Sequence, residues 1–268
     1  MDKNNRMSNY EIMTDTKKQY ESNPVLVEAV KISIQRQYVV LHDEDISQPA
    51  VEENNTEYVC SGKRSFEAAK TYAYRGMRTA VLNFANNRSV GGNPFYANAQ
   101  EEALCRCSTL LPCLEAMRES FYNRHRTMLK NGEMDFMGND DLIYTPDVVV
   151  FKSDERTEPV CPMTMPQEEW YNVDVITSAA PELFRYDGVP ADMYEGIIRS
   201  RIKKILDVAT NEKTEALILG RWGCGVFGND PNVVSRVFYD LLKHYDFAVV
   251  EFALATKDDV SNSVWAKR

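Results

Sequence analysis

Residues 81–110 carry the arrangement in this chain that is best suited to catalysis. An apolar run leads into a loop with two adjacent glycines, and the loop leads to Gln100-Glu101-Glu102. We expect the glutamates to lie in the first turn of a helix, where free backbone N–H groups and the helix dipole stabilise anions. The glycines let backbone N–H groups approach a ligand closely, as in phosphate-binding turns. The segment is therefore expected to hold a phosphate-bearing ligand and to direct one carboxylate at its reacting carbon.

The two glutamates also have a simpler explanation. Acidic residues in the first turn stabilise a helix by about 0.3 to 1 kcal/mol each, so Glu101 and Glu102 would need no ligand. The same tripeptide recurs at Gln167-Glu168-Glu169, where neither a glycine loop nor a suitable strand end precedes it. We assign this second copy to an exposed loop, and it serves as an internal comparison.

A second glycine-rich turn begins at residue 220 and reads GRWGCGVFGNDP, with four of the chain's twelve glycines. Such density costs conformational entropy and is hard to explain by packing alone. We predict a second phosphate-binding turn with Val226 and Phe227 as an apolar wall; a tight strand-to-helix connection without a ligand is the alternative.

Cys224 has no histidine or asparagine partner nearby in sequence, so a catalytic thiol is not expected. Arg221 and Trp222 would either reach the ligand or only cover the turn, and we assign neither residue a role.

A third loop consists of the small residues Ser178-Ala179-Ala180-Pro181. Such residues leave room for a flat ring or for a close backbone contact. Like the other two loops, this one follows an apolar run that is expected to be a strand.

The remaining pattern predicts strands that alternate with helices. Six short apolar runs are typical of buried strands: 57–60, 79–84, 148–151, 173–177, 216–219 and 248–254. Four helical patterns accompany them: 65–74, 99–122, 192–209 and 231–245. Pro112 is expected to kink or split the second helix, and Asn229 or Asp230 to cap the last one. This alternation indicates an α/β fold, a three-layer α/β/α sandwich around a mixed, largely parallel sheet. All three loops would then gather at the carboxyl edge of the sheet, where ligands bind in such folds.

The first part of the chain has a different pattern. Residues 7–45 predict helix followed by extended chain, with Asn23 as a cap and Pro24 in the first turn of a helix. Residues 43–56 are acidic and contain a proline, as is typical of an exposed connection. We therefore divide the chain into an N-terminal helical extension with its linker, 1–56, and a main domain, 57–268.

Composition narrows the class of protein. With 268 residues, 44% hydrophobic and 10% aromatic, the chain is long enough for one large domain with a substantial core. The net charge of -9 and the pI near 5.0 argue against broad nucleic-acid binding, which needs a basic face. An anionic ligand must then be held locally, by backbone N–H groups or a few arginines. Because no long apolar run occurs, neither a signal peptide nor a membrane span is expected.

Cysteines and histidines do not have the spacing of a metal site. No CxxC pair exists, and the histidines His42, His125 and His244 are scattered and are expected on the surface or on helix faces. We expect no metal, and buried reduced thiols in a cytoplasmic protein. The six cysteines are Cys60, Cys105, Cys107, Cys113, Cys161 and Cys224.

As a set, VLNFANN, the glycine run, QEEALCRCSTL, ITSAAP and WGCGVFGNDP resemble the bacterial type of poly(ADP-ribose) glycohydrolase, a macrodomain-like enzyme. The motifs follow the family's order and cover most of residues 57–255. The family's signature is three glycines, six to eight residues, and QEE. Here Gly91-Gly92-Asn93 is followed by six residues, so the spacing fits with the third glycine replaced; reading Val90-Gly91-Gly92 leaves seven residues and loses the first glycine.

The resemblance implies roles for individual residues. Glu102 would be the acid that protonates the leaving oxygen of a ribose–ribose bond in poly(ADP-ribose), releasing ADP-ribose without a cofactor, and Glu101 would bind hydroxyls of the reacting ribose. Asn86 would contact ribose, Gly223 to Gly228 would wrap the diphosphate with Phe227 beside the distal ribose, and the third loop would lie near the adenosine half. The implied substrate-binding residues are Asn86, Gly91, Gly92, Asn93, Gln100, Ser178, Ala179, Pro181, Gly223, Cys224, Gly225, Val226, Phe227 and Gly228.

The residue types agree with this chemistry, because cleavage of a glycosidic bond needs an acid at the leaving oxygen and stabilisation of an oxocarbenium-like transition state. Adjacent helix positions do not face each other, so Glu101 and Glu102 would divide the work. Two alternatives stay open: a reader that holds ADP-ribose without turnover, which the altered glycine run favours, and a hydrolase that removes single ADP-ribose units from protein or nucleic acid. The expected partners are thus ADP-ribose, its polymer or an ADP-ribosylated protein, and no membrane.

Overall fold

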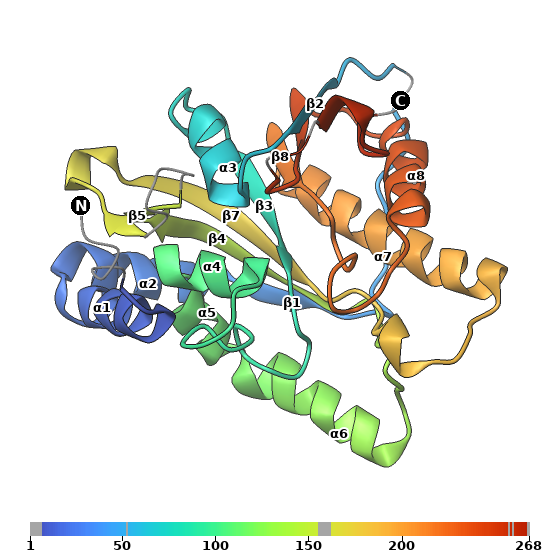
Figure 1. Ribbon diagram of the computed structural model, residues 1–268, viewed down its shortest axis with the longest axis horizontal. Coiled ribbons are helices and arrows are strands. Elements are labelled where there is room, and N and C mark those ends of the chain that lie inside the picture. Colours follow the sequence, from blue (N-terminus) through green and yellow to red (C-terminus); the bar gives the residue numbers. More distant parts are fainter. Residues whose placement is uncertain (1–6, 52, 155–161, 257, 259, 267–268) are drawn as a thin grey trace.

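The computed structural model describes residues 7–51, 53–154, 162–256, 258 and 260–266. Within these residues a seven-stranded mixed sheet has the order β1-β4-β7-β3-β8-β9-β2, with helices on both faces (Figure 1). The sheet strands are β1 (Tyr38–Val40), β2 (Glu57–Ser61), β3 (Thr79–Phe84), β4 (Leu142–Val150), β7 (Tyr171–Ser178), β8 (Ala216–Leu219) and β9 (Val249–Ala253). A separate ribbon pairs β5 (Lys152–Ser153) with β6 (Met163–Thr164).

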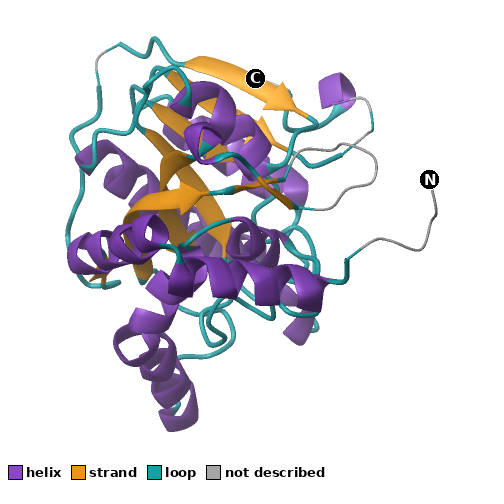
Figure 2. Cartoon of the chain, turned by 90° about the vertical axis from the view of Figure 1, so that its left-hand side faces the viewer, coloured by secondary structure: helices purple, strands orange, loops and turns teal. Residues whose placement is uncertain are grey.

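Two layers of helices bury the two faces of the sheet, as the side view also shows (Figure 2). The helices are α1 (Asn9–Ser22), α2 (Pro24–Arg36), α3 (Ser65–Ala73), α4 (Gln100–Cys107), α5 (Leu110–Ala116), α6 (Arg124–Asn131), α7 (Ala191–Asn211) and α8 (Pro231–Leu242). One core lies between the sheet and α1 to α5, and the other lies under α7 and α8. Neighbouring residues of β3 serve opposite cores, with Val81 in the first and Leu82 in the second, as the pleat of a strand requires. The predicted three-layer fold is confirmed.

The strand directions place the predicted loops together. The strands β7, β3, β8, β9 and β2 pair in parallel, whereas β4 and β1 are antiparallel to their neighbours. The carboxyl ends of the five parallel strands therefore meet at one edge of the sheet. The loops after β3, β7 and β8 start there, as the sequence predicted.

The predicted helix 99–122 is divided, but Pro112 does not cause the break. The helix α4 ends at Cys107, and Ser108 adopts an extended conformation and forms a β-bridge with Val150. Pro112 is the third residue of α5. Backbone N–H groups in the first turn of a helix have no carbonyl of the same helix to bind, so a proline there costs no hydrogen bond. The predicted caps Asn23 and Asp230 are confirmed, since each side chain accepts a hydrogen bond from the backbone N–H two residues later.

The N-terminal segment packs on the main body and also extends its sheet. The strand β1 pairs with β4 at the sheet edge, and Met13 and Leu26 are buried in the first core. Whether the chain divides functionally at residue 56 stays a prediction. Across the described ranges no helix is both long and apolar enough to cross a lipid bilayer.

Candidate active site

Glu102 is buried at the start of α4, with 7% of its surface exposed. Its Oε1 atom accepts a hydrogen bond from the backbone N–H of Asn93 at 3.0 Å. Its Oε2 atom is also buried and has no hydrogen-bond partner among the residues that the structure describes. A carboxyl oxygen that is shielded from water and left unpaired is costly unless a ligand completes it.

The position of this carboxylate depends on Gly92. This residue has a φ of +66°, and a Cβ atom built on it would lie 2.2 Å from Oε1 of Glu102. Asn93, which replaces the third glycine of the signature, is not among the described residues with positive φ. The turn therefore requires glycine at position 92, and it accommodates a side chain at position 93 without losing the N–H bond to Glu102.

Glu101 is 3% exposed, and both of its carboxyl oxygens are held. Oε2 accepts from the backbone N–H of Asn86 at 3.0 Å, and Oε1 accepts from Nδ2 of Asn83 at 3.2 Å. Burial raises the pKa of Glu101 to about 8, and the neighbouring charge of Glu102 adds to the rise, although these two hydrogen bonds oppose it. Burial therefore favours the protonated form of this carboxyl more than in a free glutamate.

Asn83 is a site residue that the sequence reasoning missed. It lies on β3, is fully buried, and donates to Thr177 Oγ1 as well as to Glu101. Its Oδ1 atom has no partner in the described part of the chain. The available signal was an amide inside the apolar run VLNF, because a buried amide in a strand needs partners.

Asn86 organises the loop that follows β3. Its Oδ1 atom accepts hydrogen bonds from the backbone N–H groups of Arg88 (2.8 Å) and Ser89 (2.9 Å). Arg88 forms an ion pair with the buried Glu182, from the loop after β7. The loop that carries the glycine pair is therefore tied to the neighbouring loop on the same edge of the sheet.

Gln100 ties α4 to the sheet. Its Oε1 atom accepts from the backbone N–H of Phe84, and its Nε2 atom donates to the carbonyl of Leu82 and to Oγ of Ser65. The three donor–acceptor distances lie between 2.8 and 3.0 Å. Gln100, a predicted ligand-binding residue, thus positions α4 against the sheet, and it also lines the cavity described next.

A cavity of about 450 Å³, hereafter the main cavity, lies between the glycine turn after β8 and the start of α4. It is lined by Phe84, Ala85, Ala99, Gln100, Ala180, Arg221, Trp222, Gly223, Cys224, Gly225, Val226 and Phe227. The N–H groups of Gly225, Val226 and Phe227 donate no hydrogen bond to any described residue. Successive free N–H groups in a turn form an anion-binding concavity, and Val226, 81% exposed, stands beside it as the predicted apolar wall.

The loop after β7 supports this turn. Ala180 lines the main cavity, whereas Ser178, Ala179 and Pro181 are buried and do not line it. A Cβ atom at Gly223, whose φ is +71°, would lie 2.4 Å from Cβ of Ala180, so the two loops need glycine there.

Two buried side chains hold these loops together. Nε1 of Trp222 donates to the carbonyl of Ser178 at 3.0 Å, so Trp222 supports the turn from below. Nδ2 of Asn229 donates to the carbonyls of Pro181 (2.9 Å) and Gly223 (3.0 Å). Sequence reasoning considered Asn229 only as a helix cap and missed this role.

The thiol of Cys224 lacks the features of a nucleophile. Burial raises its pKa to about 12, and Sγ donates to the carbonyl of Trp222 at 3.4 Å. The described cysteines are all free thiols, and Cys161 lies outside the described residues.

Two histidines that are far apart in the sequence lie together in space. Nδ1 of His42 is 2.9 Å from Oδ1 of Asp141, and Nε2 of the buried His125 is 3.1 Å from Oδ2. Burial alone would raise the pKa of Asp141, but the close approach of both histidines and the backbone N–H of His42 outweigh it and hold this pKa well below its ordinary value. The description of the histidines as scattered is therefore wrong for this pair, although neither residue lines the main cavity.

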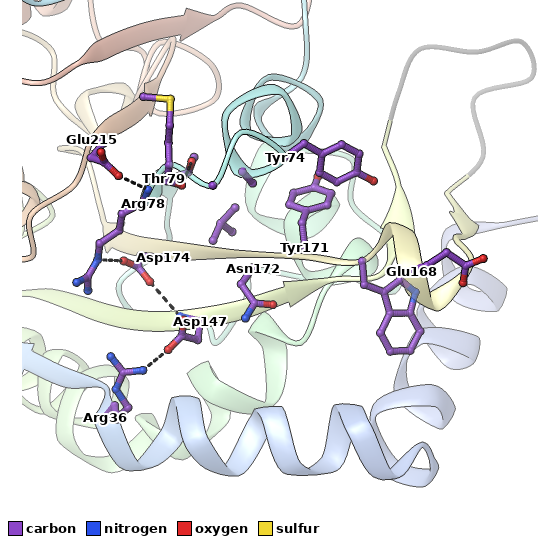
Figure 3. Close-up of a pocket in the computed structure, with 15 residues that line it drawn as sticks. Arg36, Tyr74, Arg78, Thr79, Asp147, Glu168, Tyr171, Asn172, Asp174 and Glu215 are labelled. Atoms are coloured by element: carbon purple, nitrogen blue, oxygen red, sulfur yellow. Dashed lines mark hydrogen bonds and ion pairs between the residues drawn. The ribbon is translucent and has the colours of Figure 1, made fainter.

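The second QEE copy lies at the opposite edge of the sheet. Gln167–Glu169 form an exposed 3₁₀ turn just before β7, which confirms the prediction of an exposed segment. A larger hollow of about 660 Å³ opens beside it (Figure 3). Four of its charged groups form two ion pairs: Arg36 with Asp147, and Arg78 with Asp174 at 2.9 Å. No described carboxylate there is buried without a partner, so the edge with α4 is the better candidate for chemistry.

Comparisons with known proteins give the family of this chain and similar solved structures. The family model for the catalytic domain of microbial-type PARG matches residues 6–153. The chain is similar in structure to poly(ADP-ribose) glycohydrolase from Thermomonospora curvata bound to the inhibitor ADP-HPD, with a TM-score of 0.82, 28% identity, and coverage of 96% of this chain and 98% of that chain. It is also similar to poly(ADP-ribose) glycohydrolase from Deinococcus radiodurans in complex with ADP-ribose, with a TM-score of 0.73, 27% identity, and coverage of 88% and 94%. No curated protein matches the chain.

Proposed function

The chain belongs to the family of microbial-type poly(ADP-ribose) glycohydrolases, and from this premise we propose that it cleaves the ribose–ribose bonds of poly(ADP-ribose) with Glu102 as the proton donor. The family resemblance drawn from the motifs is thereby confirmed. The observation that carries the proposal for Glu102 is its buried, unpartnered Oε2 atom. Because the N–H of Asn93 occupies Oε1, Oε2 is the atom that we assign to the leaving oxygen.

The reaction follows from this assignment. The bond between the anomeric carbon and the leaving oxygen breaks while the proton on Glu102 moves to that oxygen, and the sugar acquires oxocarbenium character. A water molecule then adds to the anomeric carbon and returns a proton to Glu102. The products are ADP-ribose and a polymer shortened by one unit.

Glu101 is proposed to bind the hydroxyls of the reacting ribose. Its oxygens are fixed by Asn83 and by the backbone of Asn86, so its position is set before substrate arrives. With a pKa of about 8 it carries a proton at neutral pH and can donate a hydrogen bond to a ribose oxygen.

The rest of the binding set is proposed from the geometry of the loops. The N–H groups of Gly225 to Phe227 donate no hydrogen bond to a described residue, and we assign them to the diphosphate. Gly91, Gly92 and Asn93 lie beside Glu102 and are assigned to the ribose end. Ala180 is the residue of the third loop that lines the main cavity, and Ser178, Ala179 and Pro181 support it from behind.

The test uses the two copies of the QEE tripeptide. Glu102→Gln is expected to lower kcat for release of ADP-ribose from poly(ADP-ribose) by about 100- to 10,000-fold, the usual contribution of a general acid. Glu168→Gln, the same change in the exposed copy, is the matched control and is expected to keep full activity. Equal activity of the two variants would refute the assignment. A wild-type chain that binds ADP-ribose without any turnover would indicate the reader instead.

The pH dependence of single-turnover cleavage tests the protonation state. An acid that works near pH 7 requires the carboxyl to hold its proton once substrate excludes water. A rate that falls above the pKa of a free glutamate would contradict this requirement.

The substrate class and compartment complete the proposal. Comparing cleavage of polymer with that of a protein carrying a single ADP-ribose separates the polymer hydrolase from the mono-ADP-ribosyl hydrolase. We propose the cytoplasm as compartment, because free buried thiols such as Cys105, Cys107 and Cys113 are typical of reducing environments.

A further inference from the structure

Arg221 has a distinctive place at the candidate site. Among the described residues that line the main cavity, it is the one that carries a charge. It also lines a neighbouring cavity of about 360 Å³, which contains Arg64 and Arg106. Arg221 therefore stands on the wall that the two cavities share.

The three arginines differ in what they bind. Arg64 pairs with the buried Asp154 at 2.5 Å, and Arg106 donates to the carbonyls of Pro94 and Ala97. Arg221 is exposed and forms no hydrogen bond or ion pair through its side chain with any residue in the described ranges. Its guanidinium is thus the cation at this edge that is available to a ligand.

The backbone on both sides of Arg221 is fixed. A Cβ atom at Gly220 would lie 2.7 Å from the carbonyl oxygen of Ala253, so the chain passes very close to β9 before Arg221. Trp222 is fully buried after it, and the carbonyl of Arg221 accepts the N–H of Cys224 at 3.0 Å. The turn therefore presents the Arg221 side chain at the cavity mouth from a rigid base.

On the basis of the proposed function, we propose that Arg221 binds the diphosphate of the ligand and supplies the full positive charge at that position. A diphosphate brings two negative charges toward a protein of net charge -9 and toward the two carboxyls of α4. The N–H groups of the glycine turn supply only partial charges, whereas a guanidinium supplies a full charge and a planar fork that matches phosphate oxygens.

This role predicts an effect on binding rather than on the chemical step. Arg221 follows β8 and Glu102 begins α4, so the guanidinium acts on the phosphates while the carboxyl acts on the ribose bond. Loss of an interaction that is equally strong in the ground state and the transition state raises KM and leaves kcat unchanged. An exposed charge is also screened by salt, so part of the affinity should disappear at high ionic strength.

The test is titration calorimetry with ADP-ribose, together with kcat and KM for polymer hydrolysis. Arg221→Gln is expected to weaken ADP-ribose binding about tenfold, Arg221→Lys less, and KM should rise by the same factors. Arg126→Gln, an exposed arginine on α6 that lines neither cavity, is the matched control for net charge and should change affinity less than twofold. Between about 50 mM and 500 mM salt the Debye screening length falls from about 14 Å to about 4 Å. Over this range the affinity of the wild type for ADP-ribose should therefore fall more steeply than the affinity of Arg221→Gln.

The outcomes separate this inference from the proposed function. Unchanged affinity and salt dependence in Arg221→Gln, or a loss of kcat at constant KM, would overturn the role of Arg221 while leaving the hydrolase intact. Failure of the wild-type chain to bind ADP-ribose at all would overturn both. Thermal unfolding of each variant shows whether the fold is retained, and Arg221→Lys provides a second variant that keeps the charge.

Discussion

At the scale of single residues, the proposed role of Glu102 requires that position 92 carry no side chain. Gly92→Ala would force Cβ against the carboxylate of Glu102 and also strain a left-handed backbone. We expect kcat to fall at least about 100-fold, the scale that small misplacements of catalytic groups cause, with a loss of about 1 to 2 kcal/mol in the free energy of unfolding. Turnover of poly(ADP-ribose) and denaturant unfolding measure the two effects.

Gly132→Ala is the control for this change. Gly132 has a similar φ of +73°, but no atom lies within 4 Å of its added Cβ. It should show the loss of stability and keep its activity. Equal activity of the two variants would mean that the contact between position 92 and Glu102 does not matter.

The raised pKa of Glu101 makes stability depend on pH. Because the folded chain holds this proton with a pKa of about 8 and an unfolded glutamate has a value near 4.5, the folded state binds more protons between these two values. The free energy of unfolding should therefore fall as pH rises from 4.5 to 8, on the order of 4 kcal/mol for this group. Glu101→Gln is neutral at every pH, so its stability should fall less over this range; parallel curves from urea unfolding would contradict the assignment.

Sequence reasoning selected candidate residues whose signal is local, and their catalytic role stays a prediction. Glu101 and Glu102 follow a glycine loop and open a helix, and both features can be read from neighbouring residues. Asn83 and Asn229 were missed because their roles depend on partners that are distant in the chain, such as Thr177 and Pro181. A polar residue in a strand or before a helix shows that a partner is needed, but it does not show which one.

At the scale of elements, α1 holds the loop that leads to α4, the helix that carries Glu101 and Glu102. Nδ2 of Asn9 lies within hydrogen-bond distance of the carbonyl of Tyr96 (3.1 Å), the carbonyl of Ala97 (3.3 Å) and Oδ1 of Asn98 (2.8 Å). We expect Asn9→Ala to increase hydrogen exchange in residues 93–99 and to lower kcat/KM several-fold, because this loop ends at Glu102's helix. Lys17→Ala, an exposed change on the same helix, should alter neither quantity.

Strand β4 shows why some elements were only partly predicted. The apolar run was assigned to 148–151, whereas the strand begins at Leu142. Pro146 and Asp147 interrupt the pattern, and a bulge between Thr145 and Val148 absorbs them. Because proline in a strand argues against pairing, the first half could not be recognised before its partner β7 was known. The parallel strands were predicted to within a few residues at each end, since each contains a short, mainly apolar run that no proline interrupts.

At the scale of the whole molecule, the alternation of strand and helix patterns in the sequence predicted the fold class. It did not predict that the N-terminal segment adds a strand to the sheet. Its helices were predicted from periodicity and from the Asn23-Pro24 cap, whereas β1 is only three residues long and is stabilised by pairing with β4. So short a strand has no pattern of its own. What makes the segment part of the body is a set of contacts with residues far along the chain.

These contacts predict that residues 1–56 are needed for folding. The carbonyl of Ile12 accepts from the buried Lys152 at 3.1 Å, Thr16 donates to the carbonyl of Arg106 at 2.6 Å, and Gln37 donates to the carbonyl of Cys113 at 3.0 Å. A chain that begins at residue 57 would leave these groups unpaired and would expose the apolar face that Met13 and Leu26 cover. Each side chain of this kind that becomes exposed costs about 1.5 to 3 kcal/mol. Together with the lost hydrogen bonds, this cost is comparable to the usual free energy of unfolding of a domain.

We therefore expect the truncated chain to lose cooperative thermal unfolding, to bind a dye for exposed apolar surface, and to be inactive. Circular dichroism and dye binding measure this directly. Adding a separate peptide of residues 1–56 should restore part of the activity, because the contacts are noncovalent. A truncated chain that unfolds cooperatively and cleaves poly(ADP-ribose) at the full rate would show that the N-terminal segment is an accessory to the catalytic body, with no part in holding α4 and its glutamates in place.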